Sequence, residues 1–261
     1  MKYIVDNDLH IHSQISACSC DPGQTTERLL EYALENGIKT LCLADHFWDD
    51  SIGGASDWYN PQNYERISKA KPLPQADGVR FLFGCETELN RDLVLGISKE
   101  NYDKFDFIVI PTTHFHMLGY TLTEEEGANA QTRADTWVKH FEAVLDMDLP
   151  FHKVGIAHLI CPLMAKECYK EMLALLPVEE MTRLFTKAAG LGVGIELNYG
   201  DILAMHKYED AARVFRIAKE CGCKFYFASD AHHPDKLASC KEVFEKAVDL
   251  LELTEEDKFR I

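Results

Sequence analysis

Two histidines stand one residue apart near the start of the sequence, in the stretch DLHIHS at residues 8–13. Side chains two residues apart on a β-strand point to the same face, so His10 and His12 can coordinate one metal ion together. Imidazole nitrogen is a common ligand of transition metals. The pair therefore predicts one half of a metal site at the end of a strand.

Similar residues recur where other predicted strands end. A single histidine at a strand end is most often a hydrogen-bonded pocket or surface residue. Here most of the chain's 11 histidines stand at such ends beside Asp and Glu, whereas His140 and His206 fall on predicted helices. This convergence favours a metal centre. The residues at the strand ends are His10, His12, His46, Glu86, His114, His116, His158, Glu196, Asn198, Asp230, His232 and His233.

Strands and helices that would position these residues alternate along the chain. Short runs of β-branched and aromatic residues predict strands, and helical periodicity fills the stretches between them. Strands separated by helices pair in parallel, and seven of them favour a closed or nearly closed α/β barrel over an open sheet. The predicted strands cover residues 3–11, 39–46, 79–89, 105–115, 153–159, 192–199 and 224–232, and the predicted helices 25–37, 134–147, 166–176, 179–192, 208–222 and 235–253.

A parallel barrel brings the C-terminal ends of its strands to one face, so the candidate ligands would meet in one pocket. Their mixed nitrogen and oxygen chemistry suits Zn, Mn or Fe rather than Ca or Mg alone. There are too many candidates for one tetrahedral ion, so we expect two to three divalent metal ions. The irregular stretch 49–78 is expected to form a loop with a short helix over the barrel mouth.

Composition narrows the class of protein. The length fits one domain over residues 1–261, and no linker or repeat interrupts it. A net charge of −16 argues against nucleic-acid binding, which depends on clustered Lys and Arg. No apolar run is long enough for a membrane span, and the N-terminus lacks a signal-peptide pattern. The nine cysteines include no CxxC pair. We expect a cytoplasmic protein with reduced thiols.

The motifs DLHIHS, LADHF, FGCETEL, PTTHFH, GIAHL, ELN and SDAHHP occur in this order across nearly the whole chain. In this they resemble the polymerase and histidinol phosphatase (PHP) family. The resemblance implies a distorted (β/α)7 TIM-like barrel that holds up to three divalent metals and hydrolyses phosphate esters. Carried over motif by motif, it assigns one ion to His10, His12, Glu86 and Asp230, a second to Glu86, His114 and His158, and a third to His46 and His232.

The sequence departs from the family pattern at the remaining ligand of the third ion. The family usually supplies Asp or His shortly after the HxH pair, but Cys18 stands eight residues beyond His10. Counting back from the helix that starts near Thr25 gives Asp21 instead, and an insertion in a loop is tolerated more readily than a shift in helix docking. We therefore expect Asp21 to complete the site, with Cys18 and Cys20 as thiolate alternatives.

Hydrolysis of a phosphate dianion needs a nucleophile formed at neutral pH and a fixed positive field. A water bound between metal ions loses its proton near neutrality, so we expect a metal-bound hydroxide to attack phosphorus in line. Glu86 and Asp230 are the expected bridging, catalytic carboxylates. Asp8 is expected to orient a ligand histidine, and His116 or His233 to protonate the leaving group.

Four further side chains are candidates for substrate binding. Arg91 and Arg133 lie on the active face by topology and suit phosphate, whereas Glu196 and Asn198 suit an amine or hydroxyl. We expect a small phosphomonoester, in its most specific form L-histidinol phosphate, because the chain resembles the stand-alone histidinol-phosphatase branch. The alternatives are a PHP-type nucleotide or nucleic-acid phosphodiesterase or exonuclease, and a non-catalytic metal-binding protein. The sequence leaves the oligomeric state open.

Overall fold

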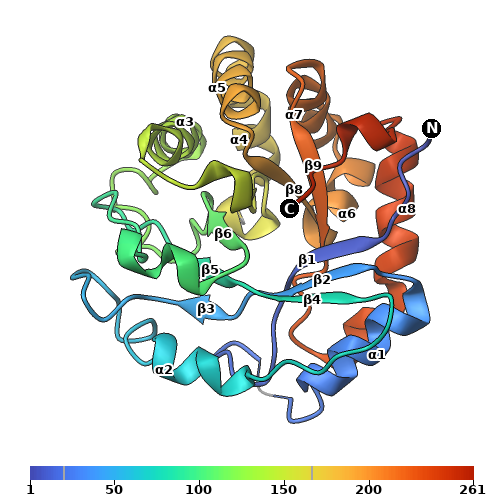
Figure 1. Ribbon diagram of the computed structural model, residues 1–261. Coiled ribbons are helices and arrows are strands. Elements are labelled where there is room, and N and C mark those ends of the chain that lie inside the picture. The colour runs from blue at the N-terminus through green and yellow to red at the C-terminus, as the bar shows by residue number, and fades with distance from the viewer. Residues whose placement is uncertain (20, 166) are drawn as a thin grey trace.

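Parallel strands line the centre of the molecule and helices cover their outside (Figure 1). The computed structural model describes residues 1–19, 21–165 and 167–261. The strands are β1 (Asn7–Ile11), β2 (Thr40–Leu43), β3 (His46–Phe47), β4 (Arg80–Phe83), β5 (Cys85–Thr87), β6 (Ile108–Pro111), β7 (Val154–Ala157), β8 (Gly194–Asn198) and β9 (Lys224–Ala228).

Two pairs of these segments are successive halves of bent strands. β2 pairs with β4, and a few residues later β3 pairs with β5, where His46 stands opposite Glu86. Gly84 forms the bend between β4 and β5, because a Cβ there would come within 2.6 Å of the Phe107 carbonyl oxygen. With each bent strand taken once, seven parallel positions follow in chain order. This is the TIM-like (β/α)7 arrangement that the sequence predicts.

The last strand lies beside the first. The amide of Asp230, just after β9, donates to the carbonyl of His10 at 2.9 Å, and the amide of His12 donates to the carbonyl of Ala231 at 3.2 Å. These bonds join the C-terminal ends of β1 and β9. Residues from the two ends of the chain therefore reach the same pocket.

Helices surround the strands, and local sequence sets several of their ends. Thr25 caps the first helix by accepting from the amide of Arg28, and Gly37 ends it in the left-handed region at φ 66°. The helices are α1 (Thr26–Asn36), α2 (Tyr64–Ile67), α3 (Ala130–Asp146), α4 (Tyr169–Leu175), α5 (Val178–Leu191), α6 (Tyr199–Lys207), α7 (Glu209–Glu220) and α8 (Cys240–Leu250), with short 3-10 helices at η1 (Ser68–Ala70), η2 (Lys99–Lys104), η3 (Phe151–Lys153), η4 (Pro162–Ala165), η5 (Pro234–Ser239) and η6 (Glu255–Asp257).

The inner face of the strands carries its own apolar cluster, apart from the larger core beneath the helices. Its buried members are Leu9, Cys42, Ala44, Leu82, Phe107, Val109, Ala157, Tyr226, Ala228 and Phe259. Phe259 comes from the C-terminal segment, which lies near the middle of the ring of strands (Figure 1), and its amide donates to Phe225 at the start of β9. The C-terminal segment thus fills the N-terminal end of the barrel, and the opposite end holds the polar side chains.

The predicted strands and helices are present, but one helix is added and several bounds differ. The last predicted helix, residues 235–253, is a 3-10 helix (η5) followed by α8. α6 was not expected, because its sequence shows no clear apolar stripe: Asp201 is buried on it beside Ile202. α3 begins at Ala130, four residues before the predicted start. The stretch 49–78 contains only α2 and a 3-10 turn, as expected. In the part of the chain that the structure describes, no helix is both long and apolar enough to cross a membrane.

Candidate metal centre

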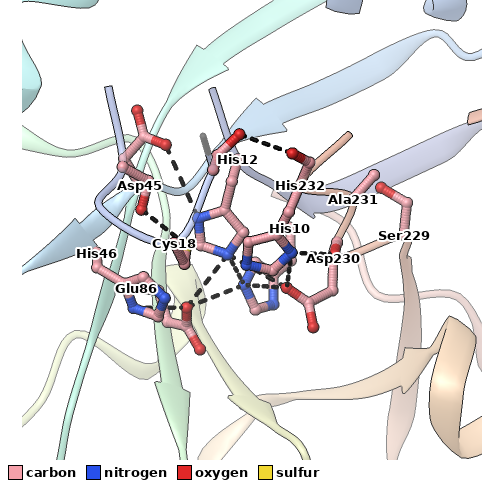
Figure 2. Close-up of polar contacts among 12 residues, drawn as sticks. His10, His12, Cys18, Asp45, His46, Glu86, Ser229, Asp230, Ala231 and His232 are labelled. Carbon is pink, nitrogen blue, oxygen red and sulfur yellow. Dashed lines mark hydrogen bonds and ion pairs between the residues drawn. The ribbon is translucent and has the colours of Figure 1, made fainter. Parts of the chain in front are cut away.

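Metal-ligand side chains from several strands meet at the C-terminal end of the barrel (Figure 2). These side chains form four groups, and within each group the possible ligand atoms all lie within 4.8 Å of one another. Because the groups share members, they form one continuous cluster. The groups are His10, His12 and Glu86; Glu86, His114 and His158; His12, Cys18, His46 and His232; and His10, His158 and Glu196.

In the first group, two imidazoles face the carboxylate of Glu86, and the carboxylate of Asp230, outside the group, lies beside them. Nε2 of His12 lies 3.1 Å from Nε2 of His10, 3.3 Å from Oε2 of Glu86 and 3.2 Å from Oδ1 of Asp230. Nε2 of His10 is also 3.3 Å from Oε2 of Glu86. Lone pairs this close repel one another unless a proton or a cation lies between them. The structure thus brings together the four residues that were expected to hold the first ion.

The second group uses the other oxygen of the same carboxylate. Oε1 of Glu86 lies 3.5 Å from Nε2 of His158 and 3.8 Å from Nε2 of His114. Oδ2 of Asp230 lies 3.6 Å from Nε2 of His158. Each of these two carboxylates thus faces ligands of more than one group, which is the geometry required of a bridging ligand.

The third group contains a thiol. Cys18 lies close to His12, His46 and His232. The ring of His12 stacks on the ring of His46 at a centroid distance of 4.7 Å and on the ring of His232 at 4.4 Å. Burial raises the pKa of the Cys18 thiol, but the imidazoles of His12 and His232 outweigh it and lower the pKa to about 5. A thiolate at this position would suit a soft or borderline ion such as Zn.

Asp21, the carboxylate expected in this group, lies elsewhere. Its Oδ2 is 2.6 Å from Nε2 of His233, and its Oδ1 accepts from the amide of Gly23 at 2.6 Å. Counting back from α1 was misleading because the intervening loop turns Asp21 toward η5 at the rim. The structure therefore brings Cys18, and not Asp21, to the cluster. Cys20 lies outside the described residues.

Unpaired buried atoms test whether the cluster fits metal ions. Glu86 is almost fully buried, yet neither of its oxygens makes a well-aligned hydrogen bond to the described residues, although Nδ1 of His46 lies 2.9 Å from Oε2. Nδ1 of His12 makes no well-aligned hydrogen bond to the described residues either. Burial alone would raise the pKa of the Glu86 carboxyl, but the imidazoles of His46 and His10 hold it well below its usual range. Burying a carboxylate anion without well-aligned hydrogen bonds costs roughly several kcal/mol unless a nearby cation compensates its charge. Divalent metals fit this requirement.

Further carboxylates orient the ligands from behind. Oε2 of Glu196 lies 2.8 Å from Nδ1 of His10, and Oε2 of Glu88 lies 2.6 Å from Nδ1 of His114. Such contacts fix the tautomer, leaving Nε2 to face the metal. Asp8, expected in this role, instead accepts from the hydroxyl of Tyr32 and the amide of Ser229. Glu88 was missed, although it stands two residues after Glu86 and alternation would have placed both on one face.

Backbone conformation also marks the site. His158 and Asp230 have φ of 54° and 48°, in the left-handed region that non-glycine residues seldom adopt. Hydrogen bonds from the Asp230 amide to His10 and from the His158 amide to Glu196 hold both in place. Such strain, of about 1–3 kcal/mol per residue, persists where the surroundings fix it, often at functional sites.

The side chains predicted to bind substrate are mostly engaged elsewhere. Asn198 caps α6 and donates to Glu196, whose oxygens already face His10 and the hydroxyl of Tyr226. Arg133 donates to two backbone carbonyls. Arg91 lies at the surface near Asp92, and His233 pairs with Asp21.

A cavity of about 490 Å³ opens onto the cluster. His116 is the one member of the predicted substrate-binding set that lines it. The outer wall is aromatic and apolar, a feature that sequence reasoning did not identify. The lining residues are Cys18, His46, Trp58, Tyr59, Glu86, His114, His116, Met117, His158, Cys161, Leu163, Asp230 and His232.

Comparison with known families identifies this arrangement. The model of the PHP domain matches residues 8–200, which includes most of the strands and all but one of the grouped ligands. The chain belongs to the PHP family. No curated protein sequence gives a significant match.

One solved structure has a similar fold over nearly the whole chain. Histidinol phosphate phosphatase from Lactococcus lactis, complexed with zinc, L-histidinol and phosphate, is 14% identical, with a TM-score of 0.56 and 93% of each chain covered. The metal-dependent tyrosine phosphatases YwqE from Bacillus subtilis and CpsB from Streptococcus pneumoniae are represented by a match of 15% identity, a TM-score of 0.45, and coverage of 96% of this chain and 89% of that chain.

Proposed function

We propose that this PHP protein hydrolyses small phosphomonoesters with two to three divalent ions, Zn, Mn or Fe, held at the cluster. The observation that carries the proposal is the buried carboxylate of Glu86, which faces imidazoles on both oxygens and makes no well-aligned hydrogen bond to the described residues. A metal-binding protein without catalysis needs no cavity at its ligands, whereas this cluster forms the floor of one.

The groups suggest how the residues divide the ions. We assign one ion to His10, His12, Glu86 and Asp230, and a second to Glu86, His114 and His158. For the third we replace Asp21 by Cys18, beside His46 and His232, because its thiol lies in that group and Asp21 pairs with His233. When bound, the ions would supply an acidified water and a positive field for the phosphoryl oxygens.

The residues of the chain have distinct parts in the reaction. Glu86 and Asp230 would hold more than one ion, and Glu88 and Glu196 keep the ligand imidazoles oriented. In the reaction a water oxygen forms a bond to phosphorus, the ester P–O bond breaks, and the leaving oxygen takes a proton, giving an alcohol and inorganic phosphate. We assign delivery of that proton to His116, because it lines the cavity and His233 does not.

A small substrate is favoured over a polymer. The cavity has the volume expected for a small-molecule site, and the chain's net charge of −16 repels long polyanions. L-histidinol phosphate is the specific candidate, since the Lactococcus structure holds L-histidinol and phosphate in the same fold. We also propose one domain over residues 1–261 and a cytoplasmic location, because the eight described cysteines are free thiols.

Metal analysis followed by an ester panel tests the proposal. Protein purified without added metal should contain two to three equivalents of Zn, Mn or Fe. It should then release phosphate from 4-nitrophenyl phosphate and L-histidinol phosphate, but degrade single-stranded DNA only slowly at physiological salt. Oligonucleotide cleavage as fast as the best monoester would favour the exonuclease alternative, and bound metal without any ester cleavage would favour the non-catalytic one.

A further inference from the structure

The outer half of the cavity differs in chemistry from its floor. Among the residues that the structure describes, no Lys or Arg lines it, and its carboxylates are only Glu86 and Asp230, both in the metal cluster. Phosphate would therefore depend on the metals for its counter-charge. The leaving group would instead meet Trp58, Met117 and Leu163.

Trp58 is a large aromatic side chain left open at this mouth. It is 40% exposed, and Leu163 across the cavity is 44% exposed. The indole edge meets the ring of His46 at a centroid distance of 4.9 Å and an interplanar angle of 73°. The ring that would face the leaving group is thus held directly beside a residue of the metal cluster.

The wall behind Trp58 is built to be stable. Tyr59 meets it edge to face at 4.8 Å and is itself fully buried, donating its hydroxyl to Glu88 at 3.1 Å. Tyr59 also stacks on Tyr120 at 5.6 Å. This aromatic group ties the loop before α2 to the residues that orient the metal ligands. A preorganised aromatic surface of this kind favours a planar partner, because rings bind in offset-stacked or edge-to-face geometry.

The cavity has room for a group beyond the phosphate. A second cavity of about 700 Å³ adjoins it and shares His116 and Leu163 with it. Exposed Leu118 and Leu175 line this second space, and Arg133, which also lines it, is held by the carbonyls of Phe115 and Met164. A ring that leaves the first cavity would meet Leu118 and Leu175 there, beside the polar side chains of Gln131, Glu167 and Glu171.

We propose that the enzyme prefers phosphomonoesters whose leaving alcohol carries a flat, uncharged ring, and that this ring lies against Trp58. The inference rests on the proposed phosphomonoesterase function and names its substrate class. The amine that L-histidinol phosphate also carries is not needed for this contact, and Glu196, the carboxylate expected to receive it, already contacts His10, Asn198 and Tyr226. The structure thus favours an arylalkyl or aryl phosphate over an aminoalkyl phosphate.

Four esters of primary alcohols test this preference without a large difference in leaving-group acidity: benzyl, cyclohexylmethyl, ethyl and 2-aminoethyl phosphate. With metal-loaded protein, kcat/KM for benzyl phosphate should exceed that for ethyl phosphate by about tenfold or more, as expected for one ring placed on an aromatic wall. Cyclohexylmethyl phosphate should fall between them, and 2-aminoethyl phosphate should not exceed ethyl phosphate. Equal rates for benzyl and cyclohexylmethyl phosphate, or a faster aminoalkyl ester, would overturn the proposal.

Variants locate the preference. Trp58→Ala should reduce the benzyl-to-ethyl ratio to about twofold or less, and Trp58→Phe should retain most of it. Leu34→Ala, at an exposed apolar residue on α1, is the matched control and should leave the ratio unchanged. Zinc content is measured for each variant, because Trp58 touches His46. If Trp58→Ala keeps both its metal and the full ratio, the assignment to Trp58 is wrong. Failure of all four esters with metal bound would instead contradict the proposed function.

Discussion

Oε2 of Glu88 lies 2.6 Å from Nδ1 of His114, and both side chains are buried, with His114 lining the cavity. The contact fixes the imidazole so that Nε2 points toward Glu86. Tyr59 donates to the same Glu88 oxygen, so one carboxylate connects a metal-ligand histidine to the aromatic wall. We therefore expect Glu88, a residue outside the ligand groups, to affect how tightly His114 binds a metal ion.

Glu88→Gln should weaken metal binding without unfolding the protein. The amide keeps the shape of the side chain but loses the charge that strengthens the histidine as a ligand. We expect metal affinity to fall by about 10–100-fold, and turnover to recover at high metal concentration. Competition with a chromophoric chelator measures the affinity. Unchanged affinity would show that the contact is merely structural.

Glu86→Gln should abolish turnover even at saturating metal. Glu86 faces His10 and His12 through one oxygen and His158 through the other, so losing its charge affects two ions together. Asp230→Asn should act in the same direction. Circular dichroism serves as the fold control, because neither side chain belongs to the apolar core. Substantial turnover by metal-loaded Glu86→Gln would exclude its bridging role.

Cobalt substitution distinguishes Cys18 from Asp21. Co²⁺ bound by a thiolate gives a charge-transfer band in the near ultraviolet, which a site of imidazole and carboxylate ligands lacks. The wild type should show this band, Cys18→Ser should lose it, and Asp21→Asn should keep it. Cys161→Ser is the matched control, because Cys161 lines the same cavity outside the ligand groups. If the band survives in Cys18→Ser but is lost in Cys161→Ser, the thiolate ligand is Cys161 and not Cys18.

His140 should make folding stability depend on pH. It is buried on α3, and this burial lowers its pKa from 6.5 to about 4. A histidine whose pKa is depressed by folding stabilises the protein above pH 6.5 and loses that contribution as the pH falls toward 4. Between pH 7 and pH 5 the loss is about 2 kcal/mol.

Urea unfolding of the wild type and His140→Gln at the two pH values measures this contribution. The variant should lose less stability on acidification than the wild type. Comparing the variants at each pH cancels metal release, which affects both proteins alike. An equal loss in the two proteins would mean that His140 is not kept neutral by the fold.

Much of this organisation could be predicted from the sequence. Alternation places His10 and His12 on one face, and parallel pairing brings His46, Glu86 and Asp230 to the same end of the barrel. Cys18 could not be separated from Asp21, because a loop of irregular conformation decides which side chain turns inward. Arg133 and Glu196 show the same limit: each lies on the expected face, but backbone carbonyls and neighbouring side chains already engage them. The aromatic wall was missed because Trp58 lies in a loop without periodicity.

Metal titration of the stripped protein tests the central claim most directly. After chelator treatment, Mn²⁺ or Zn²⁺ is added back in steps while phosphate release from benzyl phosphate and bound metal are measured on the same samples. Turnover should be absent from the stripped protein, rise with metal, and level off at two to three bound equivalents. Turnover that persists without metal, or none with three equivalents bound, would contradict a metal-dependent phosphomonoesterase.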